Sequence, residues 1–224
     1  LMKITGQFAR ETGRDYALRM IKENLVNLEL APGSQISENE LAEAMGISRT
    51  PVREALIELS KVRMIEIVPQ KKSVVAPINY DLVEEARFMR YHLETAVMDL
   101  VCEKRTEEDL KKLEANVKLQ NFYLQNGASE ELMRLDDEYH EAMYAIAQMQ
   151  EIWSLMQNMQ IHFDRVRSMA LTSVPDLKIV QDHEAMLDAI RRRDSEIAKG
   201  ILQKHLSRYK VDAAAIRAKY PEYY

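Results

Sequence analysis

Apolar residues recur every three or four positions along most of the chain, which is the spacing of helices that bury one face. Near the start, this pattern predicts a helix over residues 14–30 and, after the turn "APGSQIS", two short helices at 38–45 and 49–60. Ser37 and Glu40 have the spacing of a capping box before the first short helix. Gly46 suits the end of that helix, and Ser48 is a favourable N-cap for the second.

Two short runs of β-branched residues replace the helical spacing between residues 64 and 78. Ile65 and Ile67, then Val74 and Val75, enclose the polar turn "PQKKS", which predicts a β-hairpin. Three helices followed by such a hairpin are the element order of a winged helix-turn-helix. We therefore predict this fold for residues 1–77.

Six longer helical patterns follow Asn79, and the loops between them are short. Short loops favour antiparallel packing of successive helices, so residues 78–224 are expected to form an all-α bundle. Thr106, with Asp109 three residues later, is a predicted N-cap, and residues 213–224 are expected to fray. The fold class is thus mainly α, with an N-terminal winged helix-turn-helix and a C-terminal six-helix antiparallel bundle. The predicted helices of this bundle are 80–104, 106–126, 129–147, 150–170, 175–193 and 194–218.

The composition excludes several classes of protein. Hydrophobic residues make up 46% and charged residues 30% of the chain, as in globular proteins rather than disordered ones. No stretch reaches the roughly 18 apolar residues that a membrane span needs, so no membrane association is expected. Cys102 is the only cysteine, which rules out an internal disulfide and suits the reducing cytoplasm.

The net charge of −5 is unevenly distributed along the chain. Residues 1–77 contain 11 basic and 10 acidic side chains, whereas residues 78–224 contain 20 basic and 26 acidic ones. The N-terminal part is therefore the less acidic, and its cations can cluster on one surface.

Two of these cations, Arg49 and Arg53, stand four residues apart at the start of the second short helix. A helix N-terminus already carries partial positive charge, so unpaired cations there indicate an anionic partner. A winged helix-turn-helix lays this helix in the major groove of DNA, where arginine can pair with guanine O6 and N7. Ser48 and Thr50 are suited to hold phosphates beside it.

A plainer interpretation is open for the same cations. Arg53 could pair with Glu54 or Glu58 on a solvated helix face. Lys71 and Lys72 could merely solubilise the hairpin turn. The helix-turn-helix and the hairpin together favour DNA binding over these alternatives.

Residues 30–77, "LAPGSQISENELAEAMGISRTPVREALIELSKVRMIEIVPQKKSVVAP", resemble the DNA-binding domain of the GntR family of bacterial transcription regulators. The resemblance implies that Arg49 and Arg53 read bases and that the wing tip enters the minor groove. It also implies a transcription regulator, expected to be a repressor, that binds a double-stranded DNA operator. Pairing two copies adds affinity and operator symmetry, so a homodimer is expected.

Three residues depart from the family pattern. Arg63 and Lys72 stand where the family usually has glycine, and Asn39 stands where a basic residue often contacts DNA. These differences affect the expected wing conformation and operator sequence rather than the function. The predicted DNA-binding residues are Asn39, Ser48, Arg49, Thr50, Arg53, Lys71 and Lys72.

The helical half contains a possible metal site. Asp136 and His140 are four residues apart and so share one face of a helix. His183 and His205 each lie among apolar residues at helical spacing, so both are expected to point into the bundle. Imidazole and carboxylate together suit Zn²⁺ or a similar divalent transition metal. A single histidine on an apolar face is more often a hydrogen-bonded core residue, which is the alternative for each.

The helical half, with its order Asp…His…His…His, is similar to the FCD effector domain of this family. The resemblance implies four protein ligands for one divalent ion, zinc, with nickel or manganese as alternatives. These ligands are Asp136, His140, His183 and His205. It also implies a small carboxylate effector, which Arg90 would bind, although Arg90 could instead form an exposed pair with Glu94. His92 and His162 match no ligand position and are expected to be structural.

The leading functional hypothesis is a cytoplasmic, metabolite-responsive transcription regulator and not an enzyme. A metal-dependent hydrolase would need a general base beside a metal-bound water. Glu138 and Glu141 flank the first two ligands but are expected to point away from them. A purely structural dimerisation module would predict neither DNA binding nor metal binding.

Overall fold

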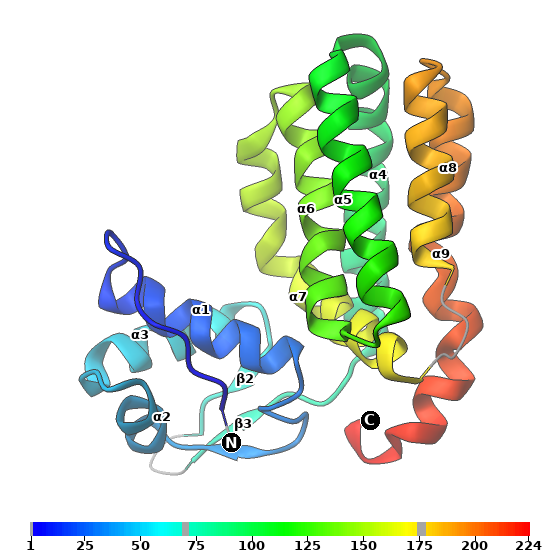
Figure 1. The fold of residues 1–224 in the computed structure, drawn as a ribbon. Coiled ribbons are helices and arrows are strands. Elements are labelled where there is room, and N and C mark those ends of the chain that lie inside the picture. The colour runs from blue at the N-terminus through cyan, green and yellow to red at the C-terminus, as the bar shows by residue number, and fades with distance from the viewer. Residues whose placement is uncertain (1, 69–71, 174–177) are drawn as a thin grey trace. The chain divides into compact units, whose positions relative to one another are not determined.

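The computed structural model describes residues 2–68, 72–173 and 178–224 of the chain (Figure 1). The chain folds into two compact units. The first contains Leu1–Tyr80 together with Tyr220–Tyr224, and the second contains Asp81–Lys219. Within the described ranges, no helix combines the length and the apolar character needed to cross a membrane.

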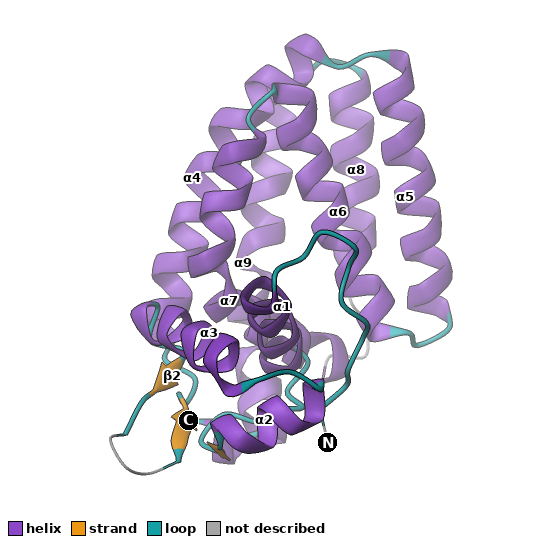
Figure 2. Cartoon of the chain, turned by 90° about the vertical axis from the view of Figure 1, so that its left-hand side faces the viewer, coloured by secondary structure: helices purple, strands orange, loops and turns teal. Residues whose placement is uncertain are grey.

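The first unit contains the helices α1 (Gly13–Val26), α2 (Glu38–Met45) and α3 (Arg49–Lys61). Among the described residues, three short strands form an antiparallel sheet in the order β1-β3-β2, drawn in orange in Figure 2. These strands are β1 (Gln35–Ile36), β2 (Ile65–Glu66) and β3 (Ser73–Val75). The predicted hairpin is confirmed, because β2 pairs with β3 and places Ile65 opposite Val75. The sequence did not predict β1, since two residues are too short to show alternation.

The core of the first unit lies between α1 and α3. Ala17 and Ile21 of α1 and Val52 and Leu56 of α3 are almost fully buried. These are the residues whose spacing predicted the two helices, so the apolar stripes of the sequence become the contact surface. The opposite side of α3, which carries Arg53, is exposed.

The helix ends agree only partly with prediction. Gly46 follows α2 with a φ of +66°, in the left-handed region that glycine adopts without strain. Ser37 and Ser48 occupy N-cap positions in an extended conformation, but neither side chain bonds to its helix. The capping box predicted at Ser37 is therefore wrong, whereas the one formed by Thr106 and Asp109 is present.

The second unit is the predicted helical bundle (Figure 1). Its helices are α4 (Tyr80–Lys104), α5 (Glu107–Gln125), α6 (Ser129–Ala147), α7 (Gln150–Ser173), α8 (Ile179–Arg191) and α9 (Ser195–Lys219). In the described residues, α5 packs against α6 and α8, and α7 packs against α6 and α9. The mainly helical fold class is confirmed, and helices from α4 to α9 contribute buried polar side chains to the interior of this bundle.

The chain end is more ordered than the sequence predicts. Residues 213–219 continue α9, and a 3₁₀ turn follows at Pro221–Tyr223. The amide of Ile78 donates to the Tyr223 carbonyl at 2.7 Å, and the rings of Tyr80 and Tyr224 stack with centroids 5.5 Å apart. The expected fraying is therefore wrong, because the terminal tyrosines find aromatic and backbone partners inside the first unit.

Candidate DNA interface and metal centre

The predicted DNA-binding residues gather at one end of α3. Ser48 precedes the helix, Arg49 is its first residue, and Ser48, Arg49, Thr50 and Arg53 are all exposed. A surface hollow is lined by residues of β1, α2, α3 and β3 and by the residues that follow β2. Its polar lining includes Ser37, Glu38, Asn39, Arg49, Arg53, Lys72 and Ser73. The fold therefore brings most of the predicted set together, while Lys71 lies outside the described residues.

Two of the cations on this surface have carboxylate partners. Nη2 of Arg49 lies 2.9 Å from Oε2 of Glu38, and Nζ of Lys72 lies 2.6 Å from Oε1 of Glu40. Both acids belong to the first turn of α2. The expectation that the arginines here are unpaired is therefore wrong for Arg49.

Arg53 differs from Arg49 in this respect. In the described part of the chain, Arg53 makes no ion pair, so the alternative in which it pairs with Glu54 or Glu58 is not formed. Glu58 is instead paired with Arg14 at 2.9 Å and with Lys61 at 2.8 Å. Arg53 thus presents an uncompensated cation on the exposed face of α3.

The predicted metal ligands also converge. Asp136 and His140 come from α6, His183 from α8 and His205 from α9, and all four side chains are largely buried. One potential ligand atom from each residue lies within 4.8 Å of the others, so the group could hold a metal ion. Nε2 of His140 is 3.3 Å from Nε2 of His183 and 3.3 Å from Nε2 of His205. Oδ1 of Asp136 is 3.5 Å from Nε2 of His183.

Each imidazole turns its other nitrogen toward an oxygen atom. Nδ1 of His183 hydrogen-bonds with Oε1 of Gln120 at 2.7 Å. Nδ1 of His140 lies 2.8 Å from Oε2 of Glu94, out of line for a hydrogen bond, and Nδ1 of His205 lies 3.7 Å from Oδ2 of Asp182. Oxygen atoms at Nδ1 favour the tautomer whose lone pair is on Nε2. Three such lone pairs then face one another.

The electrostatics of the cluster suit a cation. Burial lowers the pKa of His183 to about 3 and lowers the pKa of His140 well below its usual value, so both rings are neutral at neutral pH. Burial also raises the pKa of Asp136, but this pKa is held well below its usual range, and the charge of Arg167 is the largest of the opposing causes. Neutral imidazoles and one carboxylate form a ligand set typical of divalent transition metals.

Arg90 lies beside this cluster on α4 and is completely buried together with Glu94. Its Nε donates to Oε1 of Glu94 at 2.6 Å. Among the described residues, neither Nη1 nor Nη2 of Arg90 has a hydrogen-bond partner. The pairing with Glu94 that was considered as an alternative is therefore real, but it is not at the surface.

Arg167 on α7 is a site residue that the sequence analysis missed. Its guanidinium contacts the carboxylate of Asp136, lies 2.9 Å from Oδ1 of Asp137 and lies 2.5 Å from Oδ1 of Asp164. A buried arginine needs such partners, because leaving it unpaired would be very unfavourable. The available signal was "DRVR", in which Asp164 and Arg167 have the i,i+3 spacing of an ion pair on an otherwise apolar helix.

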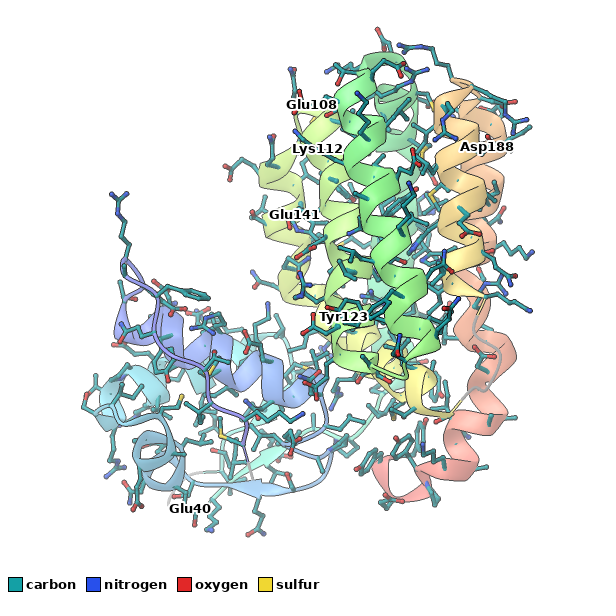
Figure 3. The ribbon with its side chains drawn as sticks, viewed as in Figure 1. Glu40, Glu108, Lys112, Tyr123, Glu141 and Asp188 are labelled. Carbon is teal, nitrogen blue, oxygen red and sulfur yellow. The ribbon has the colours of Figure 1, made fainter. Side chains whose placement is uncertain are left out.

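The structure offers no base for the hydrolase hypothesis at the positions considered. Glu138 and Glu141 are both exposed, and Glu141 lies on the outer surface of the bundle (Figure 3). Glu138 pairs with Arg134 at the surface. Neither carboxylate faces the buried cluster, as the sequence predicted.

Comparison with known proteins identifies the family. Residues 15–75 match "Bacterial regulatory proteins, gntR family", and residues 85–208 match the FCD domain. The chain belongs to the GntR family of bacterial regulatory proteins, with an FCD domain. It is 29% identical to "HTH-type transcriptional repressor RspR" of Escherichia coli K12 over 207 residues, which cover 92% of this chain and 91% of that protein.

Two further likenesses agree with this assignment. A protein of Streptomyces ambofaciens, named an HTH-type transcriptional regulator in an unstable DNA locus, is 31% identical over 95% of this chain and 89% of its own length. The solved structure "E. coli McbR/YncC" superposes with a TM-score of 0.80 at 21% identity, covering 93% of this chain and 99% of that one. This GntR-family protein is therefore a DNA-binding transcription regulator and not an enzyme.

The backbone conformation of Arg63 explains why the family usually has glycine at this position. Arg63 has a φ of +58°, in the left-handed region that glycine occupies most easily. The glycine usual in GntR-family regulators fits this backbone, and arginine adopts it at a cost of roughly 1–2 kcal/mol. Residues 69–71 of the wing tip lie outside the described residues, so the expectation attached to Lys72 stays a prediction.

Proposed function

We propose that this GntR-family regulator is a metabolite-responsive repressor that acts in the cytoplasm as a homodimer. In this proposal, residues 1–77 bind a double-stranded operator, and residues 78–224 bind one divalent metal ion and a small carboxylate effector. Two relatives bear the name repressor, RspR of Escherichia coli and NanR of Cronobacter sakazakii. The observation that carries the proposal is the convergence of three imidazole Nε2 atoms on one carboxylate.

The metal is supported by the chemistry of these atoms. Lone pairs on Nε2 atoms 3.3 Å apart repel one another unless a proton or a cation lies between them. Protons are disfavoured because burial lowers the pKa values of His140 and His183. A divalent ion bound by Asp136, His140, His183 and His205 removes this repulsion, and zinc suits the nitrogen-rich set best. Such an ion would supply a positive centre to which a carboxylate can coordinate.

The carboxylate effector is supported by Arg90. Its two terminal nitrogens are buried donors without hydrogen-bond partners among the described residues, which is unfavourable unless an acceptor is provided. A carboxylate matches the planar fork of a guanidinium. Arg90 is joined to the metal ligand His140 through Glu94, whose two oxygens lie 2.6 Å from Nε of Arg90 and 2.8 Å from Nδ1 of His140. Effector and metal would thus share one polar interior.

For DNA, we propose that Arg49 and Arg53 pair with base edges while Ser48 and Thr50 hold phosphates. Asn39, Lys71 and Lys72 would add contacts from α2 and the wing. Support comes from the exposure of these side chains, where described, and from the shared hollow. The homodimer is supported by exposed aromatic and aliphatic residues on two bundle helices. Phe88 of α4 is 60% exposed and Leu155 of α7 is 74% exposed.

A three-stage experiment tests this function. Elemental analysis after mild purification should find one divalent ion per chain. Zinc, nickel or manganese added to the metal-free protein should raise its thermal midpoint, because an ion that prefers the folded state stabilises it. The variant His183→Ala should lose this response. Absence of metal together with unchanged melting would contradict the metal proposal.

The third stage measures regulation. A fragment selected from genomic DNA by the protein itself is titrated by fluorescence anisotropy, with and without a panel of carboxylates. A carboxylate that changes operator affinity only in the metal-loaded protein supports the proposal. If the metal binds but operator affinity is unaffected by the carboxylates, the effector proposal fails and the ion is a structural component only.

A further inference from the structure

We infer that Glu38 and Glu40 act as internal counter-ions on the DNA-binding surface, and that Glu38 thereby increases selectivity for the operator. They hold Arg49 and Lys72 in the free protein. Bases of matching DNA release Arg49, whereas phosphates of any DNA release Lys72. The inference depends on DNA binding, which family membership establishes, and not on the metal or the effector. It concerns acidic residues, which a DNA-binding surface ordinarily avoids because phosphates repel them.

The geometry assigns one acid to each cation. Oε2 of Glu38 lies 2.9 Å from Nη2 of Arg49, and Oε1 of Glu40 lies 2.6 Å from Nζ of Lys72. Glu38, Arg49 and Lys72 line the same surface hollow. Glu40, from the same turn of α2, is exposed and carries its label at the edge of this unit in Figure 3. Both pairs join different elements, one between α2 and α3 and the other between α2 and the residue before β3.

The acids resemble the DNA atoms that would replace them. A carboxylate offers two acceptor oxygens to a guanidinium, and guanine offers O6 and N7 in a similar arrangement. A well-placed guanine therefore restores the hydrogen bonding that Arg49 loses when it leaves Glu38. A mismatched base does not, and Arg49 then remains with Glu38 while the carboxylate repels nearby phosphates. The acid therefore weakens binding to random DNA more than binding to the operator, which increases selectivity without increasing affinity.

Arg53 lies on the same helix as Arg49 but has no carboxylate partner among the described residues. Arg53 makes no ion pair among the described residues, whereas Arg49, four residues earlier on the same helix, does. Arg53 is thus available for first contact with any DNA. Arg49 becomes available only when it leaves the carboxylate of Glu38. The two arginines have the same chemistry, so their difference comes from the neighbouring acid alone.

The test compares charge-removing variants on two kinds of DNA. Glu38→Gln and Glu40→Gln are measured by anisotropy against the selected operator and against random duplex at several salt concentrations. Each substitution should increase the affinity for random DNA by about two- to fivefold, the range expected for loss of an exposed ion pair. For Glu38→Gln, binding to the operator should tighten less, so the ratio of the two affinities falls. Glu40→Gln should tighten binding to both DNAs alike. Glu43→Gln is the matched control, because it removes the same charge from the same helix. Glu43 is exposed and has no cation partner on the DNA-binding surface among the described residues.

A double-mutant cycle separates pairing from general repulsion. If Glu38 acts by holding Arg49, then Glu38→Gln has little effect on random DNA in an Arg49→Ala background. The same holds for Glu40→Gln in a Lys72→Ala background. An effect that persists undiminished in those backgrounds, or that Glu43→Gln reproduces, overturns the inference. Weaker operator binding by Glu38→Gln also overturns it, since Glu38 would then contact a base directly. Thermal midpoints of all variants check that each is folded.

Discussion

Nδ1 of His183 on α8 lies 2.7 Å from Oε1 of Gln120 on α5, and this contact fixes the orientation of a proposed metal ligand. The amide of Gln120 is itself oriented, because its Nε2 donates to Oδ1 of Asn116 at 2.6 Å. The oxygen of Gln120 must therefore face the ring. Gln120 supports His183 as an acceptor and leaves Nε2 of the ring turned toward Asp136.

Gln120→Leu is expected to weaken metal binding by about 10- to 100-fold, the usual effect of losing the partner of a ligating histidine. Competition with a chromophoric chelator measures the affinity. Gln120→Glu keeps an acceptor at the same place and should retain most of the metal affinity. Asn121→Leu, the next residue on α5, is the control, because its side chain bonds to Glu184 at the exposed surface. Equal loss in the Asn121 variant would contradict a specific role for Gln120.

Arg167→Met is expected to destabilise the metal-free protein and to enlarge the stabilisation that metal produces. Removing one partner of a buried ion pair costs about 3–5 kcal/mol, because Asp136 keeps its charge without compensation. A divalent ion would replace that compensation. Differential scanning fluorimetry should therefore show a lower midpoint without metal and a larger rise with it. Arg191→Met, which removes an exposed pair with Glu114, should change neither quantity.

Arg90→Lys is expected to leave metal affinity nearly unchanged and to weaken the response to the carboxylate effector by about tenfold or more. Lysine keeps a positive charge beside Glu94 but lacks the planar pair of donors. The response is read as the effector concentration that half-changes operator affinity. Arg87→Lys is the matched control on α4, since Arg87 pairs with Glu84 outside the buried cluster. A normal response in the Arg90 variant would contradict the proposed role of Arg90 in effector binding.

Arg53→Ala is expected to lower affinity for the operator far more than for random DNA. A good arginine–guanine pair is worth about 1–3 kcal/mol of discrimination. Replacement of Lys71 and Lys72 together should weaken binding to both DNAs and flatten its salt dependence, because phosphate contacts carry no sequence information. Titrations at several salt concentrations distinguish the two patterns. Equal weakening of all DNA by Arg53→Ala would show that this residue does not read bases.

Sedimentation at micromolar concentration is expected to give about twice the chain mass of 26.0 kDa, because paired helix-turn-helix units match a symmetric operator. Phe88→Glu should shift the protein toward monomer by placing a charge in an apolar contact. Phe122→Glu on α5 changes a residue of similar exposure and should leave the dimer intact. A monomeric wild type would refute the homodimer.

Much of the fold was predictable because its signals are local. The apolar stripes of α1 and α3, the β-branched residues around "PQKKS" and the box at Thr106 and Asp109 act within a few residues of one another. Such signals survive in the folded protein when no distant contact competes with them. One failure occurred where a distant contact does compete, since Ile78 and Tyr80 hold the terminal tyrosines. The other is at Ser37, whose side chain makes no cap.

By itself, the sequence determined the helices, the winged motif and the residue types available for metal and DNA. It also indicated that Asp136 and His140 share one helix face, because that relation depends only on helical spacing. Tertiary structure alone decided that His140 and His205, 65 positions apart, bring their Nε2 atoms together. It also decided that Gln120 supports His183, that Arg167 covers Asp136 and that Glu38 holds Arg49. These contacts join different elements, and their partners are set by how the helices pack rather than by any pattern along the chain.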